Sequence, residues 1–386
     1  MSVRDATSDV TNNKYEIQTA ERVVTPALLI YRDLVRSNID ATPRLLNGDL
    51  QRWRPHVKTA KLVYVMKRLT ACGVTAFKCA TSLELLMAIR DGARDVLVAY
   101  PLMGANARRI REISIQYPQV TISVLVDDAH QVDGWRGSEI GVFLDINPEM
   151  NRTGIEQDRT GDIVGLARLI SEAGLELRGL HYYDGHFASV PLPERARHAH
   201  AGYDRLMHIV EVFRANNIPV KEVITAGTPA FPCTLSYPGF LIPEFLHRAS
   251  LGTVEYCDAT AMEQLPDEFG YTPAALVLSR VVSRPTSEMI TCDAGHKTVS
   301  VDCGVPNCLA AGMNYLEPVR PSEEHLPIRV QEEMPCPELG DLRYLIPRHV
   351  CPTVNNFDWA LIIAGEEIVA VESVQARGRE EPLLQP

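Results

Sequence analysis

The chain has 386 residues, of which 46% are hydrophobic and 23% charged, proportions that are typical of a folded globular protein. Its formal net charge is −11, because 49 Asp and Glu residues outnumber 38 Lys and Arg residues. Such a surface repels the phosphate backbone of nucleic acids, so we expect small-molecule chemistry and no nucleic-acid partner. The length suits one large barrel with a smaller second domain.

The cysteines and the N-terminal residues predict a cytoplasmic protein. The cysteine count of nine is odd, and residues 1–13 lack the apolar stretch of an export signal. The longest apolar runs, such as Ala360–Ala364, are far too short to span a bilayer. We therefore expect reduced thiols, no membrane association and a cytoplasmic location.

Short apolar runs alternate with helical patterns between about residues 53 and 255. Apolar residues spaced three and four apart predict helices over Ala60–Ala71, Leu83–Asp91 and Ala201–Ala215. Eight strands are predicted, at Trp53–Lys58, Ala76–Ala80, Val96–Tyr100, Ile122–Val126, Val142–Ile146, Leu177–Tyr183, Val223–Ala226 and His247–Thr253. This alternation predicts a (β/α)8 barrel of the TIM type. An open doubly wound sheet would need a Gly-rich turn after its first strand, and that turn contains no glycine.

The residues after about 255 are predicted to form an all-β domain. Strand-like runs follow one another without long helices, at Ala275–Val282, Met289–Cys292, Thr298–Cys303, Leu342–Ile346 and Trp359–Ile363. Prolines also become frequent, which suits loops and edge strands. The expected division is a barrel over 25–255 and a β domain over 256–386, although the strand-like segment Thr25–Tyr31 could pair with the β domain.

Lys58 is the first candidate for chemistry. It ends the first predicted strand within Arg54-Pro55-His56-Val57-Lys58-Thr59, and the carboxyl ends of barrel strands form the catalytic face. Burial in a barrel mouth favours the neutral amine that Schiff-base chemistry needs. A single lysine of this kind is more often an exposed loop residue, so its role depends on other parts of the chain.

Two glycine-containing turns follow the seventh and eighth predicted strands. They read Thr225-Ala226-Gly227-Thr228-Pro229 and Ser250-Leu251-Gly252-Thr253. The loops after these strands are the usual phosphate site of this barrel, where backbone N–H groups and threonine hydroxyls donate to the anion. Together with Lys58, they predict a phosphorylated cofactor that is also bound covalently.

Three further motifs each allow a functional and a structural interpretation. Arg152, after the fifth strand, could pair with an acidic substrate or a cofactor ring, or form a surface salt bridge. Tyr183 and His186, after the sixth strand, could stack on a ligand and act as a general base, or simply pack. If their segment is extended, His349 and Cys351 face one side and could chelate Zn²⁺, although an isolated pair is more often coincidental.

In combination, these motifs resemble the D-threonine aldolase and D-serine dehydratase family, pyridoxal-phosphate (PLP) enzymes of the alanine racemase fold type. The resemblance extends from about Thr25 to Gly378, and its remaining motifs are Asp293-Ala294-Gly295-His296-Lys297 and His349-Val350-Cys351-Pro352-Thr353. It implies a PLP Schiff base on Lys58, phosphate contacts from the Gly227 and Gly252 loops, Arg152 facing the pyridine nitrogen, and a divalent metal on His349 and Cys351. We also count His56, Tyr183, Thr225, Thr228 and Thr253 among the expected cofactor-binding residues.

The chain departs from the family pattern in ways that leave the reaction open. The residue after Lys58-Thr59 is often histidine in this family, and here it is Ala60. The thiol in the metal pair and Leu97–Leu102 are closer to D-serine dehydratases, whereas Tyr183–His186 and Pro352–Asn355 are closer to the bacterial aldolases.

The resemblance implies a lyase that acts on β-hydroxy-D-amino acids with PLP and a divalent metal, either Zn, Mn or Mg, and assembles as a homodimer. In the preferred aldolase interpretation, a base such as His186 takes the β-hydroxyl proton, and glycine and an aldehyde form. In the dehydratase interpretation, Lys58 removes the α-proton, and a 2-oxo acid and ammonia form. A metal-independent amino-acid racemase of the same fold and a non-catalytic cofactor carrier are competing hypotheses, although carriers lack a β domain.

Overall fold

The computed structural model describes residues 14–242 and 244–383, so the expectation about an export signal in residues 1–13 lies outside it. The described residues group into two compact units. The barrel unit consists of the described residues in the ranges 42–58, 66–252 and 379–383. The β unit consists of the described residues in the ranges 14–41, 59–65 and 253–378. The barrel and β-domain architecture is as predicted, but the chain crosses between the units more often than one boundary near residue 255 would allow.

Side-chain contacts tie residues 59–65 to the β unit and the C-terminal residues 379–383 to the barrel unit. Residues 59–65 are tied to the β unit because the Tyr256 hydroxyl donates to Ala60 O at 2.7 Å and Lys61 Nζ donates to Ala376 O at 2.9 Å. The C-terminal segment is tied to the barrel unit because Arg109 pairs with Glu380 at 2.8 Å.

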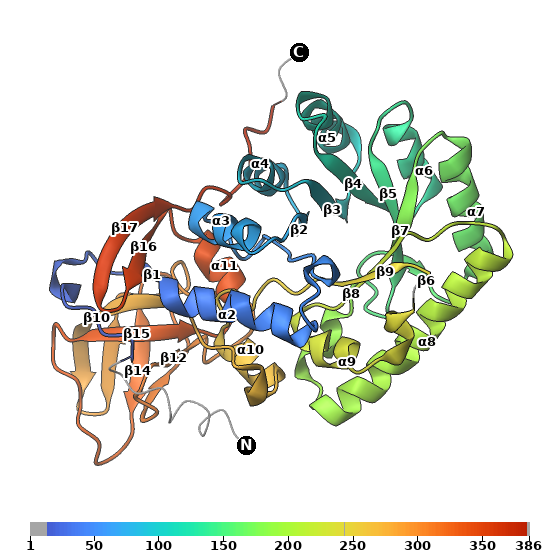
Figure 1. The fold of residues 1–386 in the computed structure, drawn as a ribbon. Helices are drawn as coiled ribbons and strands as arrows, with labels where there is room; N and C mark the ends of the chain where they lie inside the picture. Colours follow the sequence, from blue (N-terminus) through green and yellow to red (C-terminus); the bar gives the residue numbers. More distant parts are fainter. Residues whose placement is uncertain (1–13, 243, 384–386) are drawn as a thin grey trace. The chain divides into compact units, whose positions relative to one another are not determined.

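The barrel unit is built on a parallel sheet with the strand order β2-β3-β4-β5-β7-β8-β9 (Figure 1). The strands are β2 (Ala76–Cys79), β3 (Asp95–Pro101), β4 (Thr121–Val126), β5 (Gly141–Asn147), β7 (Leu177–Tyr182), β8 (Glu222–Thr225) and β9 (Leu246–Ala249), and the short β6 (Ile155–Glu156) pairs with β5. These strands correspond to seven of the eight predicted ones, with β9 ending four residues earlier than expected.

Residues 53–58 take the first strand position of the barrel without forming a continuous strand. Trp53 forms a parallel bridge with Ala249 of β9, and His56 forms one with Lys78 of β2. Pro55 accepts a hydrogen bond from Lys78 N at 2.9 Å but has no N–H of its own to donate. The segment therefore links the two ends of the sheet, as the barrel prediction requires, through isolated bridges.

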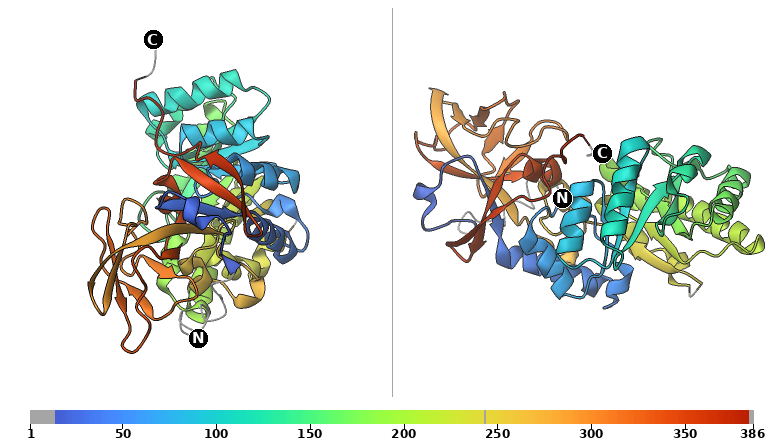
Figure 2. Two further views of the ribbon diagram at one scale, coloured as in Figure 1. Left: turned by 90° about the vertical axis from the view of Figure 1, so that its left-hand side faces the viewer. Right: turned by 90° about the horizontal axis from the view of Figure 1, so that it is seen from above.

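Helices alternate with these strands along the chain and lie outside them (Figures 1 and 2). They are α3 (Val63–Ala71), α4 (Ser82–Arg90), α5 (Gly104–Gln116), α6 (Ala129–Val132), α7 (Thr160–Glu172), α8 (Leu192–Ala215) and α9 (Phe231–Leu235). α4 starts where Thr81 caps it by accepting a hydrogen bond from Glu84 N at 3.2 Å. The three predicted helices are present, and α8 begins nine residues before Ala201.

The β unit contains a largely antiparallel sheet of nine strands, in the order β13-β14-β11-β10-β1-β16-β17, with β15 pairing with β10 and β12. The strands are β1 (Ala27–Tyr31), β10 (Ala275–Thr286), β11 (Met289–Cys292), β12 (Cys308–Ala310), β13 (Leu316–Pro318), β14 (Leu326–Val330), β15 (Leu342–Pro347), β16 (Trp359–Ala364) and β17 (Glu367–Ser373). The N-terminal β1 pairs antiparallel with β10 and parallel with β16. In Figures 1 and 2 this blue strand lies among orange and red ones.

One predicted strand of the β unit is absent, and the condition set for the His349–Cys351 pair is not met. Residues 298–303 form turns instead of a strand. The segment that starts at His349 is not extended, because α11 (Val350–Asn355) begins immediately after it and the Thr353 hydroxyl donates to His349 O at 2.8 Å. Asp258 accepts a hydrogen bond from Val350 N at 2.9 Å and holds this helix start. The argument that His349 and Cys351 share one face of a strand therefore does not apply.

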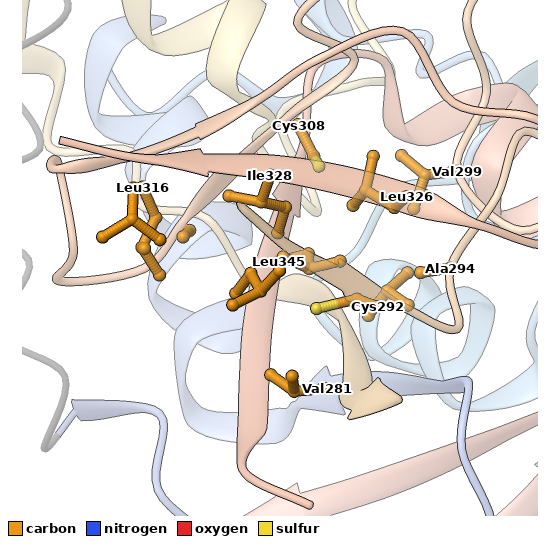
Figure 3. Packing of buried hydrophobic residues seen from close by; sticks show 13 residues of the cluster. Val281, Cys292, Ala294, Val299, Cys308, Leu316, Leu326, Ile328 and Leu345 are labelled. Carbon is orange, nitrogen blue, oxygen red and sulfur yellow. The ribbon is translucent and has the colours of Figure 1, made fainter. Parts of the chain in front are cut away.

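Separate apolar clusters stabilise the two units. Leu97, Leu125, Phe143 and Ile224 pack inside the barrel. In the β unit, a cluster that includes Val281, Ile290, Cys292, Cys308 and Leu345 fills the space between strands (Figure 3). The nine cysteines all lie in the described residues, none forms a disulfide there, and most are buried. Among the described helices, none combines the length and apolarity that crossing a membrane requires.

Candidate active site

The ring of Tyr183 is the centre of the barrel-unit site. Three cationic groups lie near its centroid, with Arg152 Cζ at 4.6 Å, Lys78 Nζ at 5.4 Å and Lys58 Nζ at 5.8 Å. Two glycines pack closely on the ring, because a Cβ at Gly185 or Gly227 would approach its atoms to 2.5 or 2.8 Å. The fold thus brings together Lys58, Arg152 and Tyr183, which the sequence placed after three different strands.

Lys78 is a second lysine of this site, and the sequence analysis missed it. Its Nζ lies 3.4 Å from His181 Nε2, while His181 Nδ1 lies 2.7 Å from Asp145 Oδ1. Asp145 also accepts a hydrogen bond from the Thr153 hydroxyl at 2.7 Å. Burial, and then the positive charges of Lys58 and Arg152, lower the pKa of Lys78 to about 7, although the carboxylates of Asp145 and Asp184 oppose this shift. A lysine within the apolar run Ala76–Ala80 was the available signal, since a buried charge requires partners.

Some expected phosphate-binding groups have partners inside the barrel. Gly227 N donates to Asp184 at 3.3 Å, and the Thr225 hydroxyl lies 2.8 Å from His247 Nε2. Asp184 also accepts a hydrogen bond from the Tyr203 hydroxyl at 2.6 Å, and burial raises its pKa to about 6. The Thr225 hydroxyl and the Gly227 N–H are therefore engaged, whereas Thr228 follows them at the start of a short 3-10 helix.

The turn containing Gly252 approaches the Lys58 segment so closely that only glycine fits. A Cβ at Gly252 would lie 2.3 Å from His56 O. The His56 side chain in turn accepts a hydrogen bond from Lys58 N at 3.2 Å. His56 thus shapes the backbone at Lys58, and its predicted contact with a cofactor stays a prediction.

His186 has the properties of a neutral base. Its ring lies 3.9 Å from that of Phe187, and its buried Nδ1 has no hydrogen-bond partner among the described residues. Burial lowers the pKa of His186, so that the imidazole is uncharged at neutral pH. The catalytic role predicted for His186 and Tyr183 stays a prediction.

The β unit holds a group of metal-ligating side chains around His349. His349 Nδ1 lies 2.5 Å from Asp302 Oδ2, and ligand atoms of His349, Asp302 and Cys303 all lie within 4.8 Å of one another. Burial lowers the pKa of His349, but a hydrogen bond to Cys351 and the nearby carboxylates outweigh this effect and raise it to about 9. Asp302 and Cys303 were missed because they were assigned to a strand, away from His349 in sequence.

Two threonines surround the thiol of Cys351. The Thr59 hydroxyl lies 2.9 Å from Cys351 Sγ, and the Thr253 hydroxyl lies 3.6 Å from it. Thr253, which was predicted to bind phosphate, therefore contacts the predicted metal ligand in this structure. Thr59, which contacts the candidate metal ligand Cys351, directly follows Lys58, the candidate cofactor lysine, in the chain.

The residues present fit both groups that the sequence suggested. For PLP, they supply an amine on Lys58, the aromatic face of Tyr183 and the cation of Arg152. For a metal ion, His349 and Cys351 supply the imidazole and thiol ligands that suit zinc, with a carboxylate beside them.

Comparison with known proteins places the chain in a family. Residues 30–237, more than half of the chain, match the family described as "Alanine racemase, N-terminal domain", and residues 274–363 match "Putative serine dehydratase domain". The chain therefore belongs to the alanine racemase N-terminal domain family. Within it, the chain is a member of the D-threonine aldolase and D-serine dehydratase group of PLP-dependent lyases, as the resemblance implied.

Two relatives and two solved structures illustrate the similarity. D-threonine aldolase of Arthrobacter is 23% identical over 92% of this chain and 93% of its own length. The 3-hydroxy-D-aspartate aldolase of Paracoccus denitrificans is 24% identical, with the same coverage. The structure of D-threonine aldolase from Filomicrobium marinum matches with a TM-score of 0.85 at 25% identity, covering 94% of this chain and 98% of that one. D-threo-3-hydroxyaspartate dehydratase from Delftia has a TM-score of 0.79 at 20% identity, covering 94% and 100%.

Proposed function

We propose that the protein cleaves β-hydroxy-D-amino acids in the manner of a D-threonine aldolase, with PLP on Lys58 and a divalent metal on His349 and Cys351. The main support is the position of Lys58 at Tyr183 with Arg152, directly before Thr59, whose hydroxyl contacts the Cys351 thiol. Two relatives along most of the chain are named aldolases of D-threonine and 3-hydroxy-D-aspartate.

The barrel-unit residues would bind and orient the reactants. Lys58 would hold the cofactor through Nζ, Tyr183 would support one side of its ring, and Arg152 would face the pyridine nitrogen. The loops of Gly227 and Gly252 would receive the phosphate. When bound, PLP delocalises charge from the substrate α-carbon, and a metal ion acts as a Lewis acid toward the β-hydroxyl.

The β-unit residues would hold the metal ion in an open site. A carboxylate can only accept hydrogen bonds, so Asp302 fixes a proton on His349 Nδ1, and a metal ion at Nε2 would displace the second proton of the imidazolium. Cys351 supplies the second ligand, and a thiolate favours zinc over manganese or magnesium. A site with so few protein ligands leaves positions for a substrate, as catalytic zinc sites do.

Removal of the β-hydroxyl proton would fall to His186. Its imidazole is uncharged, so one of its two ring nitrogens carries a lone pair that can accept a proton. This observation favours cleavage of the Cα–Cβ bond. The thiol ligand Cys351 favours the second candidate function, a dehydratase that gives a 2-oxo acid and ammonia, and a relative that matches 53% of the chain at 27% identity is named D-threo-3-hydroxyaspartate dehydratase.

The products formed from single substrates test the proposal. Purified protein with PLP and Zn²⁺ or Mn²⁺ should convert D-threonine to glycine and acetaldehyde, and His186→Ala should lose about 10²-fold in rate because the base is missing. Lys58→Ala should be inactive, and the exposed Lys221→Ala should be unaffected. Formation of a 2-oxo acid and ammonia without glycine would establish the dehydratase reaction instead. Homodimerisation and a cytoplasmic location belong to the same proposal.

A further inference from the structure

Lys78 is a buried amine of the barrel-unit site to which the proposed function gives no role. It is 2% exposed, and its Nζ lies 5.4 Å from the centroid of the Tyr183 ring, as Lys58 Nζ does at 5.8 Å. No carboxylate of the described residues lies within ion-pair distance of the Lys78 amine, which contacts the imidazole of His181 instead. A charge that is removed from water needs a partner, so an anionic ligand would stabilise this amine in its protonated form.

The His181 imidazole orients the Lys78 amine inside the barrel. Burial lowers the pKa of His181, so its ring is uncharged at neutral pH. The Asp145 carboxylate can only accept a hydrogen bond, so His181 Nδ1 carries the ring proton and Nε2 presents a lone pair to the Lys78 amine at 3.4 Å. At least one further N–H of the amine is left to donate to a ligand.

The barrel topology places Lys78 and the predicted phosphate-binding turns on opposite sides of Lys58. The turns of Gly227 and Gly252 follow β8 and β9, and a parallel bridge joins β9 to the segment 53–58, which ends at Lys58. On its other edge, the same segment is bridged to β2 at Lys78 itself. The order around the barrel is therefore the two turns, then Lys58, then Lys78.

We propose that Lys78 binds the phenolic oxygen of PLP. In PLP, the ring carbon that carries the aldehyde lies between the carbon that carries this oxygen and the carbon that carries the phosphate arm. With the aldehyde at Lys58 and the phosphate at the turns after β8 and β9, the phenolic oxygen falls on the β2 side. There the Lys78 ammonium donates a charge-assisted hydrogen bond to the phenolate. The proposal rests on the placement of PLP in the proposed function.

The charges around Lys78 agree with a role in binding an anion. Burial, and then the positive charges of Lys58 and Arg152, lower the pKa of Lys78 to about 7, although nearby carboxylates oppose this shift. A phenolate beside the amine is an opposite charge, and opposite charges favour the protonated form of an amine. Cofactor binding thus supplies the anionic partner that Lys78 lacks among the described residues.

Affinity for PLP, compared with affinity for PLP methylated on its phenolic oxygen, tests the proposal without measuring turnover. Methylation removes the negative charge of this oxygen and keeps the aldehyde and the phosphate. We expect methylation to weaken binding to the cofactor-free, full-length wild type by about 10- to 100-fold, the range for a hydrogen bond to a charged group. In Lys78→Met, which binds PLP more weakly from the start, methylation should cost less than about 3-fold, because the partner is already gone.

This double comparison separates a contact with the phenolic oxygen from a structural role. Lys78→Leu serves if methionine prevents folding, and Lys221→Met, at an exposed lysine paired with Glu176, is the matched control that should respond to methylation as the wild type does. Equal losses on methylation in the wild type and the Lys78 variant would overturn the proposal. Borohydride fixation with peptide mass spectrometry reports the lysine that holds PLP, and a label outside Lys58 would contradict the cofactor assignment instead.

Discussion

At the scale of single residues, Glu255 is an uncompensated acid. It is completely buried, and neither carboxylate oxygen has a hydrogen-bond partner in the described part of the chain. Burial, with a smaller contribution from Cys351, raises its pKa well above the usual range of a glutamate. The folded protein therefore keeps a proton on Glu255 at pH values where the unfolded chain has lost it.

This proton makes stability depend on pH. The raised folded-state pKa means that folding takes up a proton, so Glu255 costs stability increasingly as pH rises above the unfolded value. Glu255→Gln removes this cost, and its stability advantage should grow by about 1.4 kcal/mol per pH unit in that range. Urea unfolding at pH 5 and pH 8 measures the difference, with the exposed Glu268→Gln as control. An advantage of equal size at both pH values would show that Glu255 is ionised in the folded state.

At the scale of elements, the irregular segment 53–58 is held in the barrel by Arg54. Its fully buried guanidinium pairs with Glu222 at the start of β8, at 2.8 Å, and with Asp95 at the start of β3, at 2.9 Å. Burial raises the pKa of the Asp95 carboxyl, but the charges and hydrogen bonds of Arg54 and Arg178 outweigh burial and lower it. A single side chain thus ties the segment to two strands and replaces the ladder hydrogen bonds that Pro55 cannot donate.

Removing this side chain should destabilise the barrel unit. Arg54→Met leaves two largely buried carboxylates with one fewer partner, for which we expect a cost of about 3–5 kcal/mol in the free energy of unfolding. Arg178 and Arg248 still contact Asp95 and Glu222, which favours the lower end of that range. Urea unfolding measures the cost, and Arg168→Met, on the exposed face of α7, should change stability by less than about 0.5 kcal/mol. An equally small cost for Arg54→Met would show that the backbone bridges alone close the barrel.

At the scale of the whole molecule, the apolar cores of the two units are separate from the proposed metal site. Each unit has its own apolar core, and neither includes the His349 site in its cluster. The fold therefore does not depend on a metal ion in the way that a small zinc domain does.

Metal removal should accordingly abolish activity without unfolding the protein. After exhaustive chelation we expect less than about 1% of the lyase activity, because the β-hydroxyl loses its Lewis acid, and a melting temperature within a few degrees of the untreated protein. Zn²⁺ or Mn²⁺ should restore turnover. Cys351→Ala should lose the metal, and the control Cys336→Ala should retain it. Full activity in a metal-free preparation would favour a metal-independent racemase.

The amino-acid sequence alone determined the architecture and most of the candidate residues. Hydrophobic periodicity depends on neighbours along the chain, so it located seven regular barrel strands, the three predicted helices and the strand-rich second half. Local motifs named Lys58, Tyr183, Arg152 and the His349–Cys351 pair as candidates, and the family resemblance of the motifs in combination gave these residues their expected roles. Motif order along the chain was sufficient to place the protein in its family.

Only the tertiary structure decided which distant residues become partners. Lys78, His181 and Asp145 come from three strands, and nothing in their local sequence shows that their side chains converge inside the barrel. Asp302 meets His349 because residues 298–303 turn instead of forming a strand, and Asp258 holds the start of α11 directly after His349. Hydrogen bonds and charge pairs act over a few ångströms in space, whatever the separation in sequence, so these contacts exist only once the chain has folded.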